Sequence, residues 1–384
     1  MKYRTLGRTN IKVSEVGLGG EGFEKKTQEE VTKMIDTAIK EGINYIDIYN
    51  SNPKVRSYVG NALKKYPRES FVIEGHLCTT WEDNQYKRTR NIDEVKEAYK
   101  DFLDRMQLDY VDVGMIHYID DDKDFDSVFY GEIIEYAKEL QSKGIIKHLG
   151  ISTHNPDIAL RAVKTGIIDV ILFSINAAYD MLPASEDVDI LFEEDTYKDR
   201  IYQGIEPKRE KLYRICENEG VALTVMKAFG AGVLLNEKQS PFKKALTPVK
   251  CLHYCLTRPA VATVAVGASN VDEILSSVHY ERATDEEKDY AKILADAPKS
   301  AFTGQCMYCG HCAPCSVKID IAYVNKYLDL ASIQDELAET VKNHYELLDH
   351  HASECIECGL CMDNCPFGVD IIGKMKEAAK LFGK

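Results

Sequence analysis

The sequence predicts a (β/α)8 barrel followed by a small, mostly helical domain that is rich in cysteine. Two observations support this prediction. Short apolar runs alternate with amphipathic segments along roughly the first 290 residues, as expected for parallel strands that helices cover on both faces. Beyond them, eight of the twelve cysteines fall between Cys306 and Cys365. We therefore assign residues 1–297 to the barrel and residues 298–384 to the second domain.

The composition and the net charge of the chain argue against several classes of function. The 384 residues are 45% hydrophobic and 29% charged, which is ordinary for a globular protein. The net charge of -14 at pH 7 repels phosphate backbones, so we expect no nucleic-acid partner. No run approaches the roughly 18 uninterrupted apolar residues of a membrane helix, and the first residues lack the apolar core of a signal peptide. A cytoplasmic protein without a membrane partner is expected.

Eight short runs predict the barrel strands. Each is largely apolar, and many are rich in Val and Ile, as buried parallel strands require. They cover residues 13–19, 44–49, 71–77, 110–117, 147–152, 170–176, 222–228 and 261–267. A doubly wound sheet is the alternative, supported by the G-x-G-x-x-G spacing of Gly17, Gly19 and Gly22. Because eight repeats fit a closed barrel better than a six-stranded sheet, we favour the barrel.

Amphipathic segments between the strands predict the helices. Examples with helical periodicity cover residues 27–42, 92–106 and 155–166. Many of these segments end in glycine, which supplies a left-handed cap. Thr284 and Glu287 have capping-box spacing and predict a helix that closes the barrel. The connection over residues 177–204 is acidic, contains aromatic residues and is too long for a simple loop. It is either a lid or partner surface, or a solvated insertion.

Two cysteine motifs predict a ferredoxin-like domain that holds two iron–sulfur clusters. The first motif consists of Cys306, Cys309, Cys312 and Cys315, and the second of Cys355, Cys358, Cys361 and Cys365, which precedes a proline. Three thiolates at x2 spacing reach three corners of one cubane, and the fourth commonly serves the neighbouring cluster. The chemistry requires thiolates because these clusters are soft-ligand sites.

The swapped fourth cysteine gives the ligand allocation. Cys365 is assigned to the cluster of Cys306, Cys309 and Cys312, and Cys315 to the cluster of the second triplet. Two zinc sites are the alternative, but such sites usually present two ligand pairs rather than a triplet and a single cysteine. Two neighbouring [4Fe–4S] clusters would conduct single electrons. No site role is expected for Cys216, and Cys251 and Cys255 are predicted to pack in the core from one helix. Cys78 follows the third strand at the barrel mouth, where both a structural and a functional role stay open.

Seven segments spread over essentially the whole chain carry a family resemblance. They are YRTLGRTNIKVSEVGLGG, GINYIDIY, YVDVGMIH, HLGISTHNP, VALTVMKAFGAGVL, VAVGASNVDEI and, near the end, CIECGLCMDNCPFGVDI. In this order they resemble the aldo-keto reductase family, in its branch with a C-terminal ferredoxin-type domain. The resemblance implies reduction of carbonyls with a nicotinamide cofactor by an Asp, Tyr, Lys, His tetrad, with the tyrosine as general acid.

Only half of that tetrad is present. Asp47 and His117 stand at the aspartate and histidine positions, but Asn52 replaces the tyrosine and His76 replaces the lysine. An amide cannot donate a proton as a phenol can. Tyr49, two residues from Asp47 and on the same strand face, is the candidate substitute. The predicted catalytic residues are therefore Asp47, Tyr49, His76 and His117.

The two histidines and the aspartate allow three interpretations. They act as acid and base groups on a substrate oxygen, they bind a divalent metal through two imidazoles and one carboxylate, or they are hydrogen-bonded remnants that fill the site. Trp81 and Tyr118 are expected to wall the pocket.

The cofactor region also departs from the family pattern. Glu273 stands where the family often has a basic residue for the 2′-phosphate of NADP. A carboxylate there repels the phosphate, so NADP is disfavoured, whereas NADH binding and loss of nicotinamide binding both stay open. The resemblance implies a dinucleotide site at Ser152, Asn176, Lys227, Gly267 and Ser269.

Together these features predict an iron–sulfur oxidoreductase of the aldo-keto reductase type. It would reduce a small organic molecule at the barrel mouth with electrons from two [4Fe–4S] clusters, and with NAD(P)H as an optional donor. A protein of the ferredoxin or flavodoxin type is the expected redox partner. One alternative is an inactive barrel that docks a partner while the clusters relay electrons. The other is non-redox chemistry at an Asp–His–His site with structural clusters.

Overall fold

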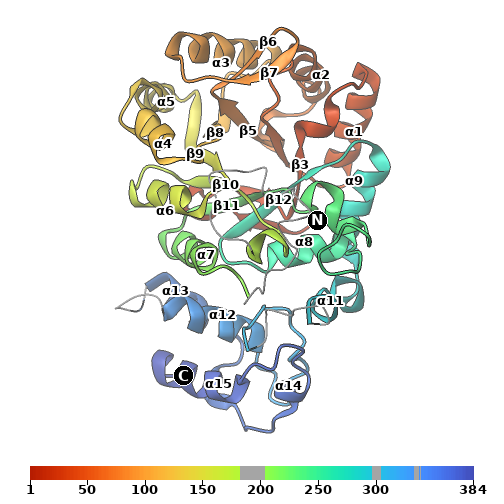
Figure 1. Cartoon of the computed structure of the whole chain (residues 1–384), viewed down its shortest axis with the longest axis vertical. Helices are drawn as coiled ribbons and strands as arrows, with labels where there is room; N and C mark the ends of the chain where they lie inside the picture. The colour runs from red at the N-terminus through yellow and green to blue at the C-terminus, as the bar shows by residue number, and fades with distance from the viewer. Residues whose placement is uncertain (182–203, 296–303, 333–336, 338) are drawn as a thin grey trace.

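Eight parallel strands close into a barrel in a computed structural model (Figure 1), which describes residues 1–181, 204–295, 304–332, 337 and 339–384. The strands are β3 (Val16–Gly19), β4 (Tyr45–Ile48), β5 (Val72–Leu77), β8 (Val111–Ile116), β9 (Ile146–Thr153), β10 (Val170–Ser174), β11 (Ala222–Met226) and β12 (Val261–Gly267). Each pairs with the next along the chain, and β12 pairs with β3 to complete the ring. The predicted barrel is confirmed, and the doubly wound alternative is wrong.

Helices cover the outside of the barrel. They are α1 (Gln28–Lys40), α2 (Pro53–Leu63), α3 (Ile92–Met106), α4 (Asp122–Phe129), α5 (Glu132–Ser142), α6 (Pro156–Lys164), α7 (Pro207–Glu219), α8 (Pro248–Leu256) and α9 (Val271–Val278). Thr27 and Glu30 form a complete capping box at the start of α1, which satisfies N–H groups that the helix itself leaves unpaired. The three helices predicted as examples correspond to α1, α3 and α6.

The barrel is closed at the amino ends of its strands. There β1 (Tyr3–Thr5) and β2 (Lys12–Ser14) form an antiparallel hairpin. Leu6 and Val13 from this hairpin pack with Val113, Met115 and other buried side chains of the barrel interior. Because this end is filled, access to the interior is from the carboxyl ends of the strands, where barrel active sites lie.

A second hairpin lies at the open end and was not predicted. It consists of β6 (Thr79–Glu82) and β7 (Gln85–Arg88) and follows β5 directly. The long connection predicted over residues 177–204 lies mostly outside the described residues, which resume at residue 204. Among the helices that are described, none is long and apolar enough to cross a membrane.

A small helical region follows the barrel and packs against it beside α7 and α11 (Ala291–Ala295) (Figure 1). Its helices are α12 (Ile321–Ala331), α13 (Glu339–Glu346), α14 (Leu360–Asp363) and α15 (Ile371–Phe382). The predicted capping box of Thr284 and Glu287 is formed at α10 (Asp285–Lys288). The proposed domain boundary near residue 297 falls outside the described residues.

Candidate active site and metal centres

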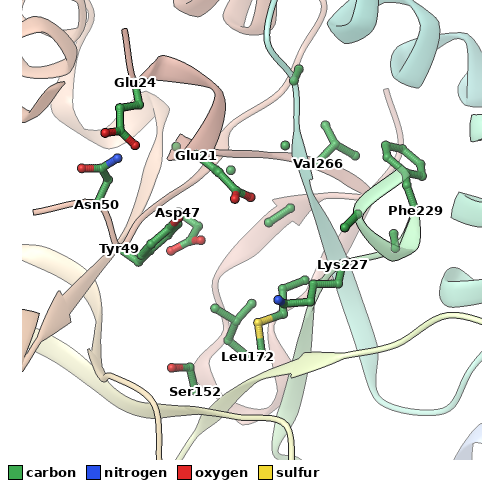
Figure 2. Close-up of a pocket in the computed structure, with 18 of the residues that line it drawn as sticks. Glu21, Glu24, Asp47, Tyr49, Asn50, Ser152, Leu172, Lys227, Phe229 and Val266 are labelled. Carbon is green, nitrogen blue, oxygen red and sulfur yellow. The ribbon is translucent and has the colours of Figure 1, made fainter. Parts of the chain in front are cut away.

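A cavity of about 970 Å³ opens among the carboxyl ends of the barrel strands and the loops that follow them. Its wall contains all four predicted catalytic residues, which are Asp47, Tyr49, His76 and His117. Trp81 and Tyr118 also line it, as expected. Figure 2 shows Asp47 and Tyr49 on one side of the cavity and Lys227 and Phe229 on the other.

Asp47, His76 and His117 form one hydrogen-bonded chain. They come from β4, from β5 and from the end of β8, which are neighbours in the barrel. Nε2 of His76 lies 2.9 Å from Oδ1 of Asp47, and Nδ1 of His76 lies 2.8 Å from Nδ1 of His117. A doubly protonated His76 satisfies both contacts, because it donates one N–H to the carboxylate and the other to the second imidazole.

Burial and charge set the proton positions along this chain. Burial opposes the charged form of His76, but Asp47 and Glu74 outweigh it and raise its pKa to about 9. Glu74 lies inside the barrel, where Tyr45 donates to it, and its Oε1 is 3.7 Å from Nε2 of His76. Burial and the charge of His76 lower the pKa of His117 well below its ordinary value. At neutral pH His76 is therefore the cation and His117 the neutral acceptor.

Tyr49 stacks on His117, with ring centroids 5.7 Å apart and planes within 4°. Burial and nearby carboxylates raise the pKa of Tyr49 above its ordinary value, so its phenol stays protonated. Asn52 has a different role. It caps α2 by accepting a hydrogen bond from the N–H of Lys54 at 3.0 Å, and it is not part of the cavity wall.

The direct contact between the two histidines bears on the metal interpretation. In the described part of the chain, Asp47, Glu74 and His76 place one potential ligand atom each within 4.8 Å of one another, and His117 is not in this group. Both ring nitrogens of His76 face hydrogen-bond partners instead of a shared centre. The geometry therefore favours proton transfer over a metal site with two imidazoles.

Only some of the residues predicted to bind a dinucleotide line the cavity. Those that line the cavity are Ser152, Lys227 and Gly267. Asn176 is buried outside the cavity wall. Its amide donates to the carbonyl of Lys227 at 2.9 Å and accepts from the N–H groups of Ala178 and Tyr179 at 3.0 and 2.9 Å. Asn176 thus holds a turn together instead of presenting its amide to a cofactor.

Glu273 covers the start of α9. Its carboxylate accepts from the N–H of Ser269 at 2.7 Å and from the side chain of Asn270 at 2.8 Å. A 2′-phosphate would lose those donors and would meet a like charge. The cavity wall holds four carboxylates, from Glu21, Glu24, Asp47 and Glu273, against one lysine, and Figure 2 shows Glu21 reaching into the cavity. The cavity wall beside Glu273 is therefore predominantly acidic.

The cysteines of the second domain gather in two separate pockets. One is lined by Cys306, Cys309, Cys312 and Cys365. The other is lined by Cys315, Cys355, Cys358 and Cys361. All twelve cysteines of the chain are free of disulfides. Each pocket therefore offers four thiol ligands, the set that a [4Fe–4S] cluster requires, and the fourth ligand is exchanged between the two motifs.

The first cysteine pocket lies against the barrel. Arg258, at the end of α8, is buried and donates to the carbonyl of Met307, and the hydroxyl of Tyr290 donates to the same carbonyl at 2.8 Å. The guanidinium also lies over the rings of Tyr254 and Tyr308, 4.6 and 5.4 Å from their centroids. A buried cation is therefore fixed beside the first thiolate set.

Residues 15–250 match the aldo/keto reductase family, and residues 349–369 match the 4Fe-4S binding domain. The chain belongs to the aldo/keto reductase family. It is similar to the uncharacterized oxidoreductase YqkF of Bacillus subtilis, with 28% identity over 75% of this chain and 94% of that protein. It is also similar to the NADH-specific methylglyoxal reductase of Escherichia coli, with 29% identity over 50% of this chain and 63% of that protein.

The solved structures agree with this assignment. The holo form of aldo-keto reductase AKR11C1 from Bacillus halodurans aligns with a TM-score of 0.58 and 25% identity, over 78% of this chain and 97% of that chain. This aldo/keto reductase thus combines the barrel of its family with a 4Fe-4S binding domain.

Sequence reasoning missed two groups of this aldo/keto reductase site. Glu74 is fully buried and lies 3.7 Å from His76, and its signal is a carboxylate two residues before His76 within a predicted buried strand. Tyr86, from the second hairpin, lies 5.7 Å from His117 between ring centroids. Its segment has no apolar periodicity, so no sequence signal identifies it.

Proposed function

We propose that this aldo/keto reductase reduces a small organic molecule in the barrel cavity with electrons from two [4Fe–4S] clusters in its second domain. The observation that carries the proposal is the chain of Asp47, His76 and His117. It supplies a buried, positively charged proton source at the place where the family's tyrosine and lysine are missing. The substrate is expected to be a polarised double bond such as a carbonyl.

His117 is proposed to give the proton to the substrate. A proton that leaves its Nε2 toward the cavity is replaced at its Nδ1 by the N–H of His76, 2.8 Å away. Asp47 then stabilises the remaining charge and orients the His76 ring at 2.9 Å. Tyr49 keeps the ring of His117 in place by stacking on it. The three residues thus work as a relay, and Asp47 and His76 act as positioning residues.

Electron supply is assigned to the second domain. Cys306, Cys309, Cys312 and Cys365 would hold one [4Fe–4S] cluster and Cys315, Cys355, Cys358 and Cys361 the other, and these clusters, when bound, supply single electrons. Reduction of a carbonyl to an alcohol consumes two electrons and two protons. The buried contact of Arg258 and Tyr290 with the carbonyl of Met307 fixes the first pocket against the barrel.

The second cysteine pocket is proposed as the entry point for electrons. Cys358 is exposed, and so are Ile356, Leu360 and Met362, which surround it in the sequence. Exposed apolar side chains next to a redox centre are typical of a transient docking surface. We expect a one-electron carrier of the ferredoxin or flavodoxin type to bind there.

NADH is proposed as an optional second donor, and NADPH is not. The name of the Escherichia coli relative specifies NADH, which lacks the 2′-phosphate. The hydrogen bond between Glu273 and the N–H of Ser269 supports the same preference here.

Turnover of methylglyoxal by oxygen-free holoprotein tests the function. Reduced methyl viologen, NADH and NADPH are compared as electron donors. We expect turnover with the viologen and a loss of about 10²–10⁴-fold in His117→Ala. His148→Ala is the matched control, because His148 is bonded to Asp169 outside the cavity. Equal turnover in His117→Ala, or turnover with reduced methyl viologen that survives complete removal of iron, contradicts the proposal.

A further inference from the structure

A second histidine–carboxylate pair, formed by His154 and Asp120, lies at the wall of the same cavity. His154 follows β9, and Asp120 lies in the loop after β8. Nδ1 of His154 donates to Oδ2 of Asp120 at 2.8 Å, and the backbone N–H of His154 donates to Oδ1 at 2.6 Å. The hydroxyl of Thr153 donates to Oδ1 as well, at 2.7 Å. Three donors thus fix a carboxylate that the relay described above does not use.

The other ring nitrogen of His154 has no assigned role. The side chain is 8% exposed and forms part of the cavity wall. Its Nε2 is buried and has no hydrogen-bond partner within the described part of the chain. Buried polar atoms are nearly always paired. Since Asp120 fixes the proton on Nδ1, Nε2 is left to exchange a proton with a ligand.

Tyr118 is close to both histidines. Its ring centroid lies 6.2 Å from that of His117 and 5.5 Å from that of His154. The strands β8 and β9, which carry these residues, are direct neighbours. A small molecule held against Tyr118 is therefore near both imidazoles, since all three residues line the same cavity.

We propose that His154 is a second catalytic acid–base residue and that Asp120 is its positioning residue. The proposal rests on the proposed function and adds the source of the second proton. Two electrons and two protons convert X=C to HX–CH: one atom of the double bond takes its proton from His117 and the other from His154. For this step His154 first takes a proton from water at Nε2, and Asp120 stabilises the imidazolium so formed. That imidazolium then gives the proton to the substrate atom and returns to its neutral form.

The first test uses His154→Asn in the holoprotein. The asparagine amide keeps the donor to Asp120 and removes Nε2. With reduced methyl viologen and methylglyoxal, we expect kcat to fall about 10²-fold or more, with KM, iron content and melting temperature unchanged. His148→Asn is the matched control, because His148 makes the same type of bond to Asp169 at 2.9 Å outside the cavity. Full turnover in His154→Asn overturns the proposal.

Chemical rescue with added imidazole distinguishes a catalytic role of His154 from a purely structural one. Added imidazole should restore part of the turnover of His154→Ala, because it can occupy the vacated space and carry the proton. It should not restore Asp120→Ala, in which the ring remains. Loss of turnover that accompanies loss of iron, without rescue, overturns the catalytic role.

A measurement that does not depend on turnover distinguishes failure of this inference from failure of the proposed function. Nitrogen-15 NMR of oxidised holoprotein with labelled histidine reports which ring nitrogen carries a proton, and it needs no reagent to reach the buried ring. We expect the neutral ring of His154 to carry its proton on Nδ1, toward Asp120, and to lose this preference in Asp120→Ala. A proton fixed on Nε2 of His154 overturns the inference. The expected proton position in a wild-type protein without any turnover contradicts the proposed function instead.

Discussion

His76 lies between a carboxylate and a second imidazole, and its proton affinity follows from these neighbours. Its pKa rises from 6.5 to about 9 in the folded chain, because the two carboxylates outweigh burial. A lysine at this place would carry a charge but would lack a second nitrogen to pass a proton on. With a partner at each ring nitrogen, His76 is placed to relay a proton in the proposed function.

This shift makes the stability of the protein depend on pH. Because the pKa of His76 is raised on folding, its contribution is fully present below pH 6.5 and is lost as pH rises through 9. We expect the free energy of unfolding to fall by about 3 kcal/mol over this window, measured by denaturant titration of holoprotein. Asp47→Asn should flatten the dependence. An unchanged pH dependence of the unfolding free energy in that variant would show that Asp47 does not stabilise the positive charge of His76.

We also predict that Glu273 sets the preference between NADH and NADPH. Glu273→Lys frees the N–H of Ser269 and places a cation beside it. Binding of NADPH should tighten roughly tenfold relative to NADH, measured by isothermal titration. Asp272→Lys adds the same charge next to it but outside the cavity wall and should have little effect. Equal tightening in both variants would mean that only net charge matters.

At the scale of elements, the apolar runs predict all eight barrel strands because burial on both faces leaves a clear pattern. The hairpin of β6 and β7 was missed because β7 is exposed along its whole length, so no alternation marks it. The contact of His76 with His117 joins residues 41 positions apart. This contact exists because β5 and β8 are neighbours in the closed barrel.

The spacing of the two motifs predicts that the fourth cysteine of each serves the neighbouring cluster. The pockets place Cys365 with the first triplet and Cys315 with the second. Cys365→Ser should therefore alter the same cluster spectrum as Cys312→Ser, measured by electron paramagnetic resonance after reduction. A spectrum that matches Cys361→Ser instead would show that each motif keeps its own fourth ligand.

The end of α8 connects barrel and second domain through Arg258. Arg258→Met removes the donor to the carbonyl of Met307 and the contact with the Tyr308 ring. We expect a loss of about 2 kcal/mol in stability and faster release of iron to a chelator. Arg282→Met is the control, because Arg282 is exposed and pairs with Glu41 on the surface. Iron release at the wild-type rate in Arg258→Met would exclude a role of this contact in holding the first pocket.

At the scale of the whole molecule, substrate chemistry and electron supply are assigned to different regions that pack together (Figure 1). The barrel holds a deep cavity with acid–base groups and an acidic wall. The helical region holds eight cysteines in two pockets, the first of them against the barrel. In the proposed function, the barrel supplies the protons and the helical region supplies the electrons.

The most direct test is a single turnover in the absence of any nicotinamide. Oxygen-free protein is reduced, freed of reductant and mixed with methylglyoxal, and the paramagnetic signal of the reduced clusters is followed. We predict that the signal disappears as product forms in the wild type and persists in His117→Ala. A signal that persists in the wild type, with product formed only when NADH is added, would contradict the account.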